Sequence, residues 1–396
     1  MKLDEEDREI PALDFQNFKV ISAVGRGAKG VVFLAKDEVS DEFVALKVIA
    51  KALIEGKGKA DGGEYKRIFF EQQVLRRLSH PLLPRLRGVL ATENVVAHAI
   101  DYCPGGNLHS LRKRQTEKMF SDDVIRFYAA ELVLALEYLH SFGIVYRDLK
   151  PENVMIQENG HIMLVDFDLS TRLSPKSPRS TPESDLVPKS NSVKKKRLSP
   201  LHRFCNSGIL PEDSISPGNS VKPESDPTEK CNSFVGTEEY VAPEIVLGNG
   251  HDFAVDWWSL GVVLYEMLYG TTPFRGSNRK ETFYRILSKT PELTGETTPL
   301  RDLIAKMLEK DPEKRIELEG IKGHDFFRGI EWDYVLGISR PPFVPQDETG
   351  GIEGNKNIDA ELFVQSLVGN GEADVDRVVE NNNNHKTTEI DKFLIF

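Results

Sequence analysis

The sequence predicts an α+β protein in which a small antiparallel sheet comes first and a larger helical part follows. From Phe15 to about Ile49, short β-branched and aromatic runs alternate with glycines, a pattern typical of antiparallel strands. Farther along, apolar residues recur at helical spacing from Phe120 to His140 and around Val255 to Tyr269. Thr171 to about Lys230 is rich in Ser, Pro and Lys and lacks an apolar period, which predicts a long disordered insert.

Bulk composition limits the classes of protein to which this chain can belong. Its 396 residues are 39% hydrophobic, which is enough for large buried cores. A formal net charge of -11 argues against a general nucleic-acid or anionic-membrane binder, because such surfaces are normally basic. The three cysteines, Cys103, Cys205 and Cys231, suggest neither a disulfide framework nor a zinc site. No run approaches the ~20 apolar residues that span a bilayer, so we expect an intracellular protein with at most peripheral membrane contact.

Three further segments complete the expected organisation. Glu64 to Ser79 has helical character, and Ser121 and Asp122 can cap the helix that follows them. Beyond Pro345 the chain becomes acidic and polar, before a final apolar cluster at Phe393 to Phe396. We therefore expect tails that are ordered only where they dock.

A glycine-rich segment lies between two apolar runs near the N-terminus. Its sequence, Gly25-Arg26-Gly27-Ala28-Lys29-Gly30, can close backbone N–H groups over phosphates. A dinucleotide-binding fold would need a helix to begin at Gly30, but Val31 to Leu34 is β-branched and aromatic. The pattern therefore favours a hairpin that covers phosphates, with an ordinary glycine hairpin as the open alternative.

A lysine and a glutamate follow this segment as candidates for an ion pair. Lys47 ends a predicted strand, where its ammonium can bind phosphates if an acidic side chain holds it. Glu71 is the expected partner because the following Val74 and Leu75 turn the apolar face of its helix inward, and Glu64 is the competing choice. Taken alone, each of these charges is more often a solvated surface group.

The most specific motif is Tyr146-Arg147-Asp148-Leu149-Lys150-Pro151-Glu152-Asn153, which resembles the catalytic loop of protein kinases. The resemblance implies a bilobal kinase fold, with a β-rich N-lobe and a helical C-lobe, that transfers the γ-phosphoryl group of ATP. In that family the aspartate, here Asp148, accepts the proton of the substrate hydroxyl, and the asparagine, here Asn153, binds Mg²⁺. Lys150 is similar to the lysine of the serine/threonine branch, which neutralises the transferred group. Tyr146 stands where many kinases have histidine, and we expect it to pack structurally.

Asp166-Phe167-Asp168 follows an apolar run and stands where protein kinases carry D-F-G. Asp166 keeps the carboxylate that binds Mg²⁺, whereas Asp168 replaces a glycine whose backbone visits conformations that strain other residues. Because Asp tolerates positive φ better than most residues, we expect narrower loop motion and no loss of the metal ligand. The D-F-D sequence resembles the plant-specific AGC kinases, which also carry an insert in this segment.

The resemblance implies ATP and Mg²⁺ as cofactors and places the nucleotide between the N-lobe and a hinge. Ile100 would be the gatekeeper residue of that hinge. Cys103 is a candidate redox or covalent site, but we expect its thiol to be buried and inert. The implied ATP-binding residues are Gly25, Arg26, Gly27, Gly30, Val32, Lys47, Glu71, Asp101 and Cys103.

Three C-lobe residues are implied to have structural roles. Glu244, in the sequence Ala-Pro-Glu, would pair with Arg315, and Asp256 would brace the catalytic loop. These residues indicate the fold more than the activity.

The activation segment and the tail imply how such a kinase is switched on. Ser233 has the spacing of the activating phosphosite of AGC kinases, where a phosphate can pair with Arg147; a plain loop serine is the alternative. Phe393 and Phe396 resemble the F-x-x-F motif that ends the AGC tail. The motif implies docking in a groove beside the Glu71 helix, in cis or on the upstream phosphoinositide-dependent kinase.

The resemblance therefore implies a serine/threonine protein kinase that acts on Ser/Thr hydroxyls of protein substrates in plant intracellular signalling, in oxidative stress or growth. Glu152 and Glu266 match acids that bind substrate arginines in AGC kinases, whereas Asn107 replaces a third acid, which weakens a preference for basic substrates. No nucleic-acid partner is expected.

Localisation and two alternative functions depend on the insert and on Asp168. Lys194 to Arg197 is a basic run that can address a protein to the nucleus or to acidic lipids, or is a solvated charge run. We expect a cytoplasmic or nuclear protein, with peripheral contact at the plasma membrane. A pseudokinase scaffold, which Asp168 invites, and an adaptor localised through the insert stay open. The expected domains are a tail over 1–14, an N-lobe over 15–100, a C-lobe over 101–327 with the insert at about 171–230, and an AGC tail over 328–396.

Overall fold

The structure is a computed structural model, and it describes residues 12–27, 30–55, 63–173, 235–338, 341–345, 358–369 and 394–395. Most of the predicted insert, with the basic run inside it, lies outside these residues. The described part contains one N-terminal sheet and a larger set of helices, which confirms the α+β fold class. None of its helices is long and apolar enough to cross a membrane.

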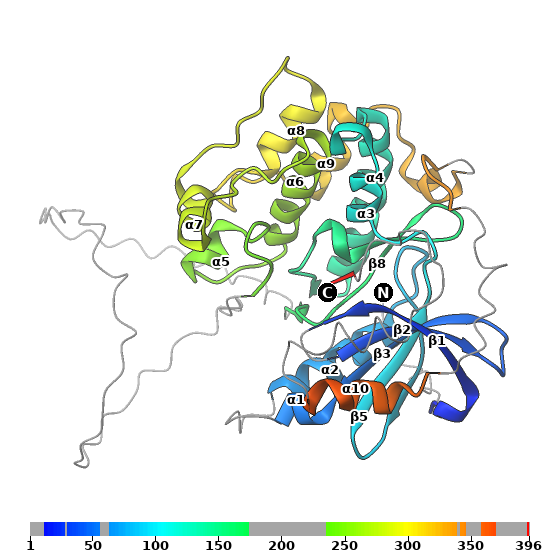
Figure 1. Ribbon diagram of the computed structural model, residues 1–396. Helices are drawn as coiled ribbons and strands as arrows, with labels where there is room; N and C mark the ends of the chain where they lie inside the picture. The colour runs from blue at the N-terminus through cyan, green and yellow to red at the C-terminus, as the bar shows by residue number, and fades with distance from the viewer. Residues whose placement is uncertain are drawn as a thin grey trace, which may run out of the picture. The chain divides into compact units, whose positions relative to one another are not determined.

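The N-terminal sheet has six strands in the described part of the chain (Figure 1). They are β1 (Phe18–Arg26), β2 (Gly30–Asp37), β3 (Phe43–Ala50), β4 (Leu86–Ala91), β5 (Val95–Asp101) and β10 (Leu394–Ile395). Their order is β10-β1-β2-β3-β5-β4, in which β1 to β5 pair antiparallel and β10 runs parallel to β1. Because side chains alternate between the faces of a strand, Leu46 and Val48 point to one side and Lys47 to the other.

Two helices follow β3 and cover one face of the sheet. α1 (Lys51–Glu55) is short, and α2 (Gly63–Arg77) confirms the helix predicted from Glu64 to Ser79, with its ends moved by one or two residues. Glu71 lies on the inner side of α2 and is only 2% exposed. Val74 and Leu75 are also buried, at 5% and 2% exposure, which confirms the inward apolar face predicted for this helix.

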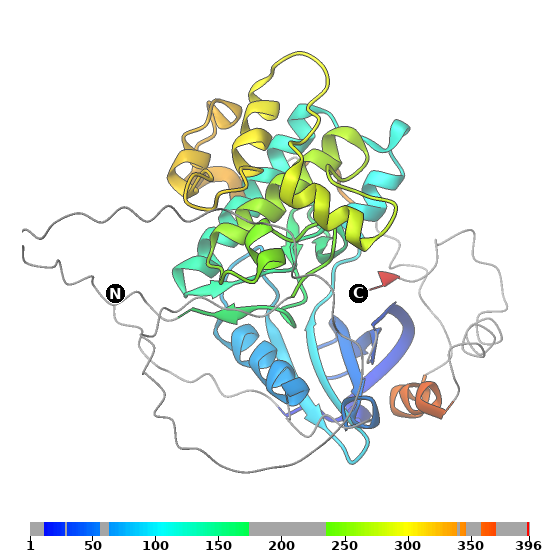
Figure 2. The ribbon, with the colours of Figure 1, turned by 90° about the vertical axis from the view of Figure 1, so that its left-hand side faces the viewer.

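A helix from the C-terminal tail covers the opposite face. Figure 2 shows α10 (Ala360–Gly369), in orange, on the side of the strands away from α2. Val364 is fully buried against the apolar side chains of β2, β3 and β5, and the ring of Phe363 meets Phe33 edge-on at 5.5 Å. This segment was expected to be acidic and polar, so the structure adds an ordered helix where it docks.

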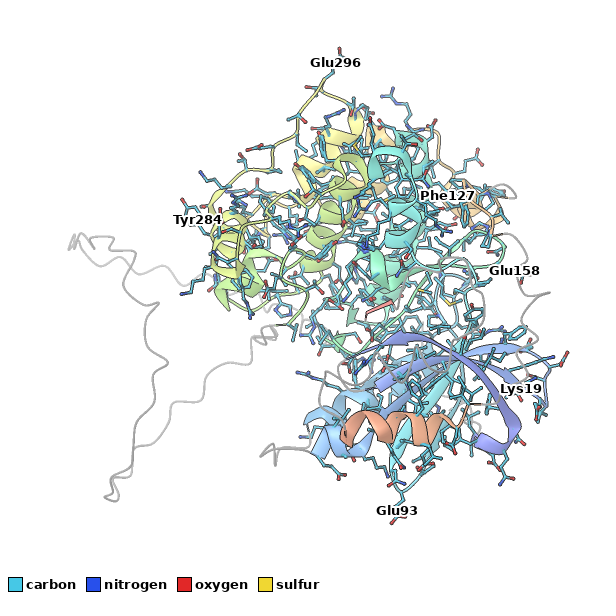
Figure 3. The ribbon with its side chains drawn as sticks, in the orientation of Figure 1. Lys19, Glu93, Phe127, Glu158, Tyr284 and Glu296 are labelled. Atoms are coloured by element: carbon cyan, nitrogen blue, oxygen red, sulfur yellow. The ribbon has the colours of Figure 1, made fainter. Side chains whose placement is uncertain are left out.

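The same helix also contacts the turn between β4 and β5, which carries Glu93 at its tip (Figure 3). Glu361 accepts hydrogen bonds from Thr92 Oγ1 at 3.0 Å and from Asn94 Nδ2 at 2.9 Å. The tail is thus attached to the sheet by polar as well as apolar contacts.

The helical part is built around two long helices, α4 and α6. Its helices are α3 (Leu108–Lys113), α4 (Asp122–Ser141), α5 (Pro243–Leu247), α6 (Ala254–Tyr269), α7 (Arg279–Ser288), α8 (Pro299–Met307) and α9 (Leu318–Lys322). The helices predicted from the apolar spacing are therefore confirmed in α4 and α6. Ser121 occupies the N-cap position of α4, although its side chain makes no capping hydrogen bond.

Short strand pairs set the position of the segments that carry the motifs. Strand β6 pairs with β9, and β7 pairs with β8. Tyr146 follows β6 directly, and Asp166 comes two residues after β8. The bounds are β6 (Ile144–Val145), β7 (Val154–Ile156), β8 (Ile162–Leu164) and β9 (Thr171–Arg172), with 3-10 turns at η1 (Phe15–Asn17), η2 (Thr116–Lys118), η3 (Pro151–Asn153), η4 (Asp325–Phe327) and η5 (Trp332–Gly337).

Candidate active site

The glycine-rich segment forms the turn between β1 and β2. Gly27 N donates to Gly30 O at 2.9 Å, and Ala28 and Lys29 lie outside the described residues. A Cβ on Gly30 would come within 2.2 Å of Val48 O, so the close approach of β2 and β3 requires glycine there. Because Gly30 begins a strand, the hairpin is confirmed and the dinucleotide-binding alternative is wrong.

Lys47 joins three elements through its ammonium. Nζ lies 3.0 Å from both carboxylate oxygens of Glu71 on α2 and 3.1 Å from Oδ1 of Asp166. Burial opposes the charge of Lys47, but the carboxylates of Asp166 and Glu71 outweigh it and raise the pKa of Lys47. Burial likewise opposes ionisation of Asp166, yet Lys47 lowers the pKa of its carboxyl group. The predicted pair of Lys47 and Glu71 is thus present, with a third charged member.

Asp148 is 6% exposed and is held by three side chains. Its Oδ1 accepts a hydrogen bond from Thr237 Oγ1 at 2.9 Å, and its Oδ2 lies 3.1 Å from both Lys150 Nζ and Asn153 Nδ2. Lys150 Nζ also donates to Thr237 Oγ1 at 3.2 Å. Burial raises the pKa of Asp148, while Lys150 acts against that rise. A fixed carboxylate with a raised pKa is suited to accept a proton from a hydroxyl group.

Asn153 and Asp166 offer the kind of oxygen that Mg²⁺ prefers. Asn153 is fully buried, and its Nδ2 donates to Asp148 O at 2.9 Å. Its Oδ1 has no hydrogen-bond partner among the described residues, a state that costs about 1–3 kcal/mol in a buried group. The two segments lie together, since Val165 N donates to Asn153 O at 3.0 Å. A carboxylate beside an unpartnered amide oxygen fits a magnesium ion.

Asp256 fixes the backbone just before Asp148. The buried carboxylate accepts hydrogen bonds from Tyr146 N at 2.9 Å and from Arg147 N at 2.8 Å. Arg147 has a φ of 69°, a conformation that costs energy in a residue other than glycine and that these bonds support. Tyr146 is buried and donates its hydroxyl proton to Val165 O, so its expected packing role is present.

A buried ion pair anchors the segment that carries Thr237. Arg315 Nη1 and Nη2 lie 2.7 and 3.0 Å from the two carboxylate oxygens of Glu244, at the start of α5. The pairing expected from the sequence is therefore found. Gly236, just before Thr237, has a φ of 109°, which favours glycine at that position.

The structure changes the explanation given for Asp168. The residue with positive φ is Asp166, at 61°, and Asp168 is not among the described residues with such a value. Asp168 instead lies in a turn in which Ser170 N donates to Phe167 O at 3.0 Å. Tolerance of positive φ is therefore not what admits Asp168 in this conformation.

Of the two hinge residues predicted to bind ATP, Asp101 forms hydrogen bonds with arginines and Cys103 is buried. The carboxylate of Asp101 accepts hydrogen bonds from Arg85 N at 3.0 Å and from Arg87 Nε at 2.6 Å, so its side chain is bound to β4. Cys103 is 4% exposed with its Sγ 3.6 Å from Met163 Sδ, and burial raises the pKa of its thiol. The thiol has the environment of an inert group, as expected.

The two acids expected near the substrate differ in their contacts. Glu266 Oε1 lies 2.6 Å from Arg112 Nη2, and both side chains are buried. Glu152 Oε1 lies 3.1 Å from His109 Nδ1, whereas its Oε2 has no hydrogen-bond partner in the described part of the chain. Asn107 caps α3 and accepts from Ser110 N. Glu152 therefore keeps one buried carboxylate oxygen without a hydrogen-bond partner among the described residues.

Several predicted residues lie outside the described residues, namely Ser233, Phe393, Phe396 and the run Lys194 to Arg197. Between the two phenylalanines, Leu394 and Ile395 pair with Gly25 and Arg26 of β1. The contact of Thr237 with Asp148 was not predicted from the sequence. The position of Thr237 directly after Gly236 in the activation segment was the feature of the sequence that could have indicated this contact.

Comparisons with known proteins agree with this geometry. A family model described as "Protein kinase domain" matches residues 18–187 and 219–327. "Serine/threonine-protein kinase OXI1" of Arabidopsis thaliana is 62% identical over 373 residues, covering 92% of this chain and 88% of that protein. "Serine/threonine-protein kinase UCN" of the same plant is 43% identical, covering 86% and 87%, and "Serine/threonine-protein kinase AGC1-5" is 38% identical, covering 85% and 60%. The chain therefore belongs to the protein kinase family, as a serine/threonine kinase of the plant AGC group.

Proposed function

We propose that this kinase binds ATP beneath the β1–β2 turn, with Lys47 on the phosphates and with Asn153 and Asp166 on Mg²⁺. Protein kinases as a family use both cofactors, and bound Mg²⁺ neutralises charge on the phosphate oxygens. Glu71 then holds the Lys47 ammonium in position. The observation that carries the proposal is the contact of Lys47 with both Glu71 and Asp166, which joins the sheet, α2 and the segment after β8.

The protein substrate binds at the part of the site that contains Asp148, Lys150 and Thr237. Asp148 accepts the proton of the serine or threonine hydroxyl, and Lys150, 3.1 Å away, provides positive charge beside it. The hydroxyl group of Thr237 holds the side chains of Asp148 and Lys150 in position through hydrogen bonds to both. Catalysis consists of positioning and charge neutralisation.

The effect of Mg²⁺ on nucleotide affinity tests these assignments. The wild-type protein should bind ATP more tightly when Mg²⁺ is added in calorimetry, and Asp166→Asn should lose that gain together with phosphoryl transfer. Asp325→Asn neutralises an exposed carboxylate on η4 that pairs with Arg328 and belongs to none of the motifs, and it serves as the matched control. A full Mg²⁺-dependent gain in Asp166→Asn would contradict the assignment.

Activation proceeds through phosphorylation of Ser233 by an upstream phosphoinositide-dependent kinase that docks on Phe393 and Phe396. Between the two phenylalanines, Leu394 and Ile395 pair with β1 of the same chain, so docking on the other kinase would require this pairing to open. Removing residues 393–396 should lower Ser233 phosphorylation by that kinase in vitro. Alanine at Leu394 and Ile395 keeps both phenylalanines and is the control. Unchanged Ser233 phosphate in the truncated protein would refute docking.

A further inference from the structure

His98 is a buried histidine to which the site described above assigns no role. It lies on β5 directly opposite Lys47 of β3 in the register of the sheet, on the face that α2 covers. Its side chain is 1% exposed, and its Nε2 lies 3.9 Å from Oε2 of Glu71. Its Nδ1 has no hydrogen-bond partner among the described residues. A buried imidazole next to the ion pair of a kinase therefore needs an explanation.

The environment of His98 sets its charge and its tautomer. Burial, with the positive charge of Lys47 nearby, lowers the pKa of His98 to about 3, so the ring is neutral at physiological pH. A neutral imidazole carries one N–H group. A proton on Nε2 faces a carboxylate, whereas a proton on Nδ1 would have no acceptor among the described residues. This arrangement favours the tautomer with its proton on Nε2.

The two oxygens of Glu71 are not held equally. Oε1 accepts hydrogen bonds from Lys47 Nζ at 3.0 Å and from Phe167 N at 3.3 Å. Oε2 accepts from Lys47 Nζ at 3.0 Å, and the next donor toward it in the described part of the chain is His98. If Lys47 also contacts phosphates, Oε2 is the oxygen whose support weakens.

We propose that His98 is a positioning residue for Glu71, which donates its Nε2 proton to Oε2 when Lys47 is shared with a nucleotide. The present 3.9 Å exceeds the hydrogen-bonding range, and a shift of about 1 Å closes it. His98 thereby keeps Glu71, and with it α2, in place on the sheet. The inference rests on the proposed nucleotide site at Lys47.

Three substitutions separate hydrogen bonding from packing. His98→Gln places an amide near the position of Nε2, His98→Asn places it near Nδ1, and His98→Met fills the space without a donor. We expect kcat/KM for ATP to fall about tenfold in the Met and Asn variants, which is about 1.4 kcal/mol, and to stay within about twofold of wild type in the Gln variant. Equal losses in all three variants, at equal thermal stability, would overturn the proposal.

Nitrogen NMR gives a readout that needs no turnover, and the spectrum of His98→Met identifies the signal of His98 among the nine histidines of the chain. With ¹⁵N-histidine labelling, His98 should show a protonated Nε2 whose proton shifts downfield when ADP is added, with no change between pH 6 and pH 8. A proton on Nδ1, or an Nε2 signal that ADP leaves unchanged, would refute the role. If the protein binds ADP and transfers phosphate but His98 fails these tests, the proposed function stands without this inference.

Discussion

Replacing Thr237 with valine tests whether one hydroxyl group organises the catalytic side chains. Thr237 Oγ1 donates to Asp148 at 2.9 Å and accepts from Lys150 at 3.2 Å, so the substitution removes two hydrogen bonds to charged groups. Asp148 and Lys150 also contact each other directly at 3.1 Å, and that contact remains. Because this remaining contact offsets part of the loss, we count the net loss of one hydrogen bond to a charged group, worth about 1.5–3 kcal/mol. This loss predicts a fall in kcat/KM of about 10- to 150-fold.

The same substitution should change the dependence of the rate on pH. The hydrogen bond from Thr237 lowers the pKa of Asp148, which burial otherwise raises. Without that bond the pKa of Asp148 rises further, and a higher pH is needed to deprotonate the base. The acidic limb of the profile of kcat/KM against pH should therefore move to higher pH in Thr237→Val.

Peptide phosphorylation followed across pH measures both effects. Thr237→Ser keeps the hydroxyl group and should stay within about threefold of the wild-type rate. Thermal unfolding of each variant shows whether the fold is kept. A valine variant with the wild-type rate and an unmoved acidic limb would refute the reasoning.

Three further predictions concern stability and localisation. Val364→Ala leaves a cavity at a fully buried position on α10 and should lower the free energy of unfolding by about 2 kcal/mol. Leu362 is 62% exposed, so Leu362→Ala should change the free energy of unfolding by less than about 0.5 kcal/mol. Equal effects of the two substitutions in denaturant titrations would contradict the packing of this helix. Glu244→Gln leaves Arg315 buried with a neutral partner and should cost about 3–5 kcal/mol, and a loss below about 1 kcal/mol would show that the pair matters little. Alanines at Lys194 to Arg197 should shift a fluorescent fusion away from the nucleus or membrane and leave kinase activity intact, and an unaltered distribution would exclude the basic run as an address.

The sequence predicted the groups whose chemistry depends on spacing within one segment. Asp148, Lys150 and Asn153 belong to one loop, and Lys47 and Glu71 lie on a strand and a helix whose patterns set their inward faces. The pair of Lys47 and Glu71 could be favoured over Glu64 because the apolar residues after Glu71 fix the rotation of its helix.

Contacts between distant segments were not predictable in the same way. Thr237 reaches Asp148 across 89 positions in the chain, and no local pattern specifies that return. His98 lies in an apolar strand without a motif, and its meaning depends on the register between β3 and β5. The helix α10 is too short to be stable alone and depends on the sheet that it covers.

Phosphoryl transfer by pure protein tests the central claim most directly. Protein carrying phosphate on Ser233, given ATP, Mg²⁺ and a peptide with serine or threonine, should phosphorylate that peptide. Asp148→Asn should bind ATP within about twofold of wild type and should transfer phosphate about 10²- to 10⁴-fold more slowly. Absence of transfer by the wild-type protein, or equal transfer by Asp148→Asn, would contradict the account.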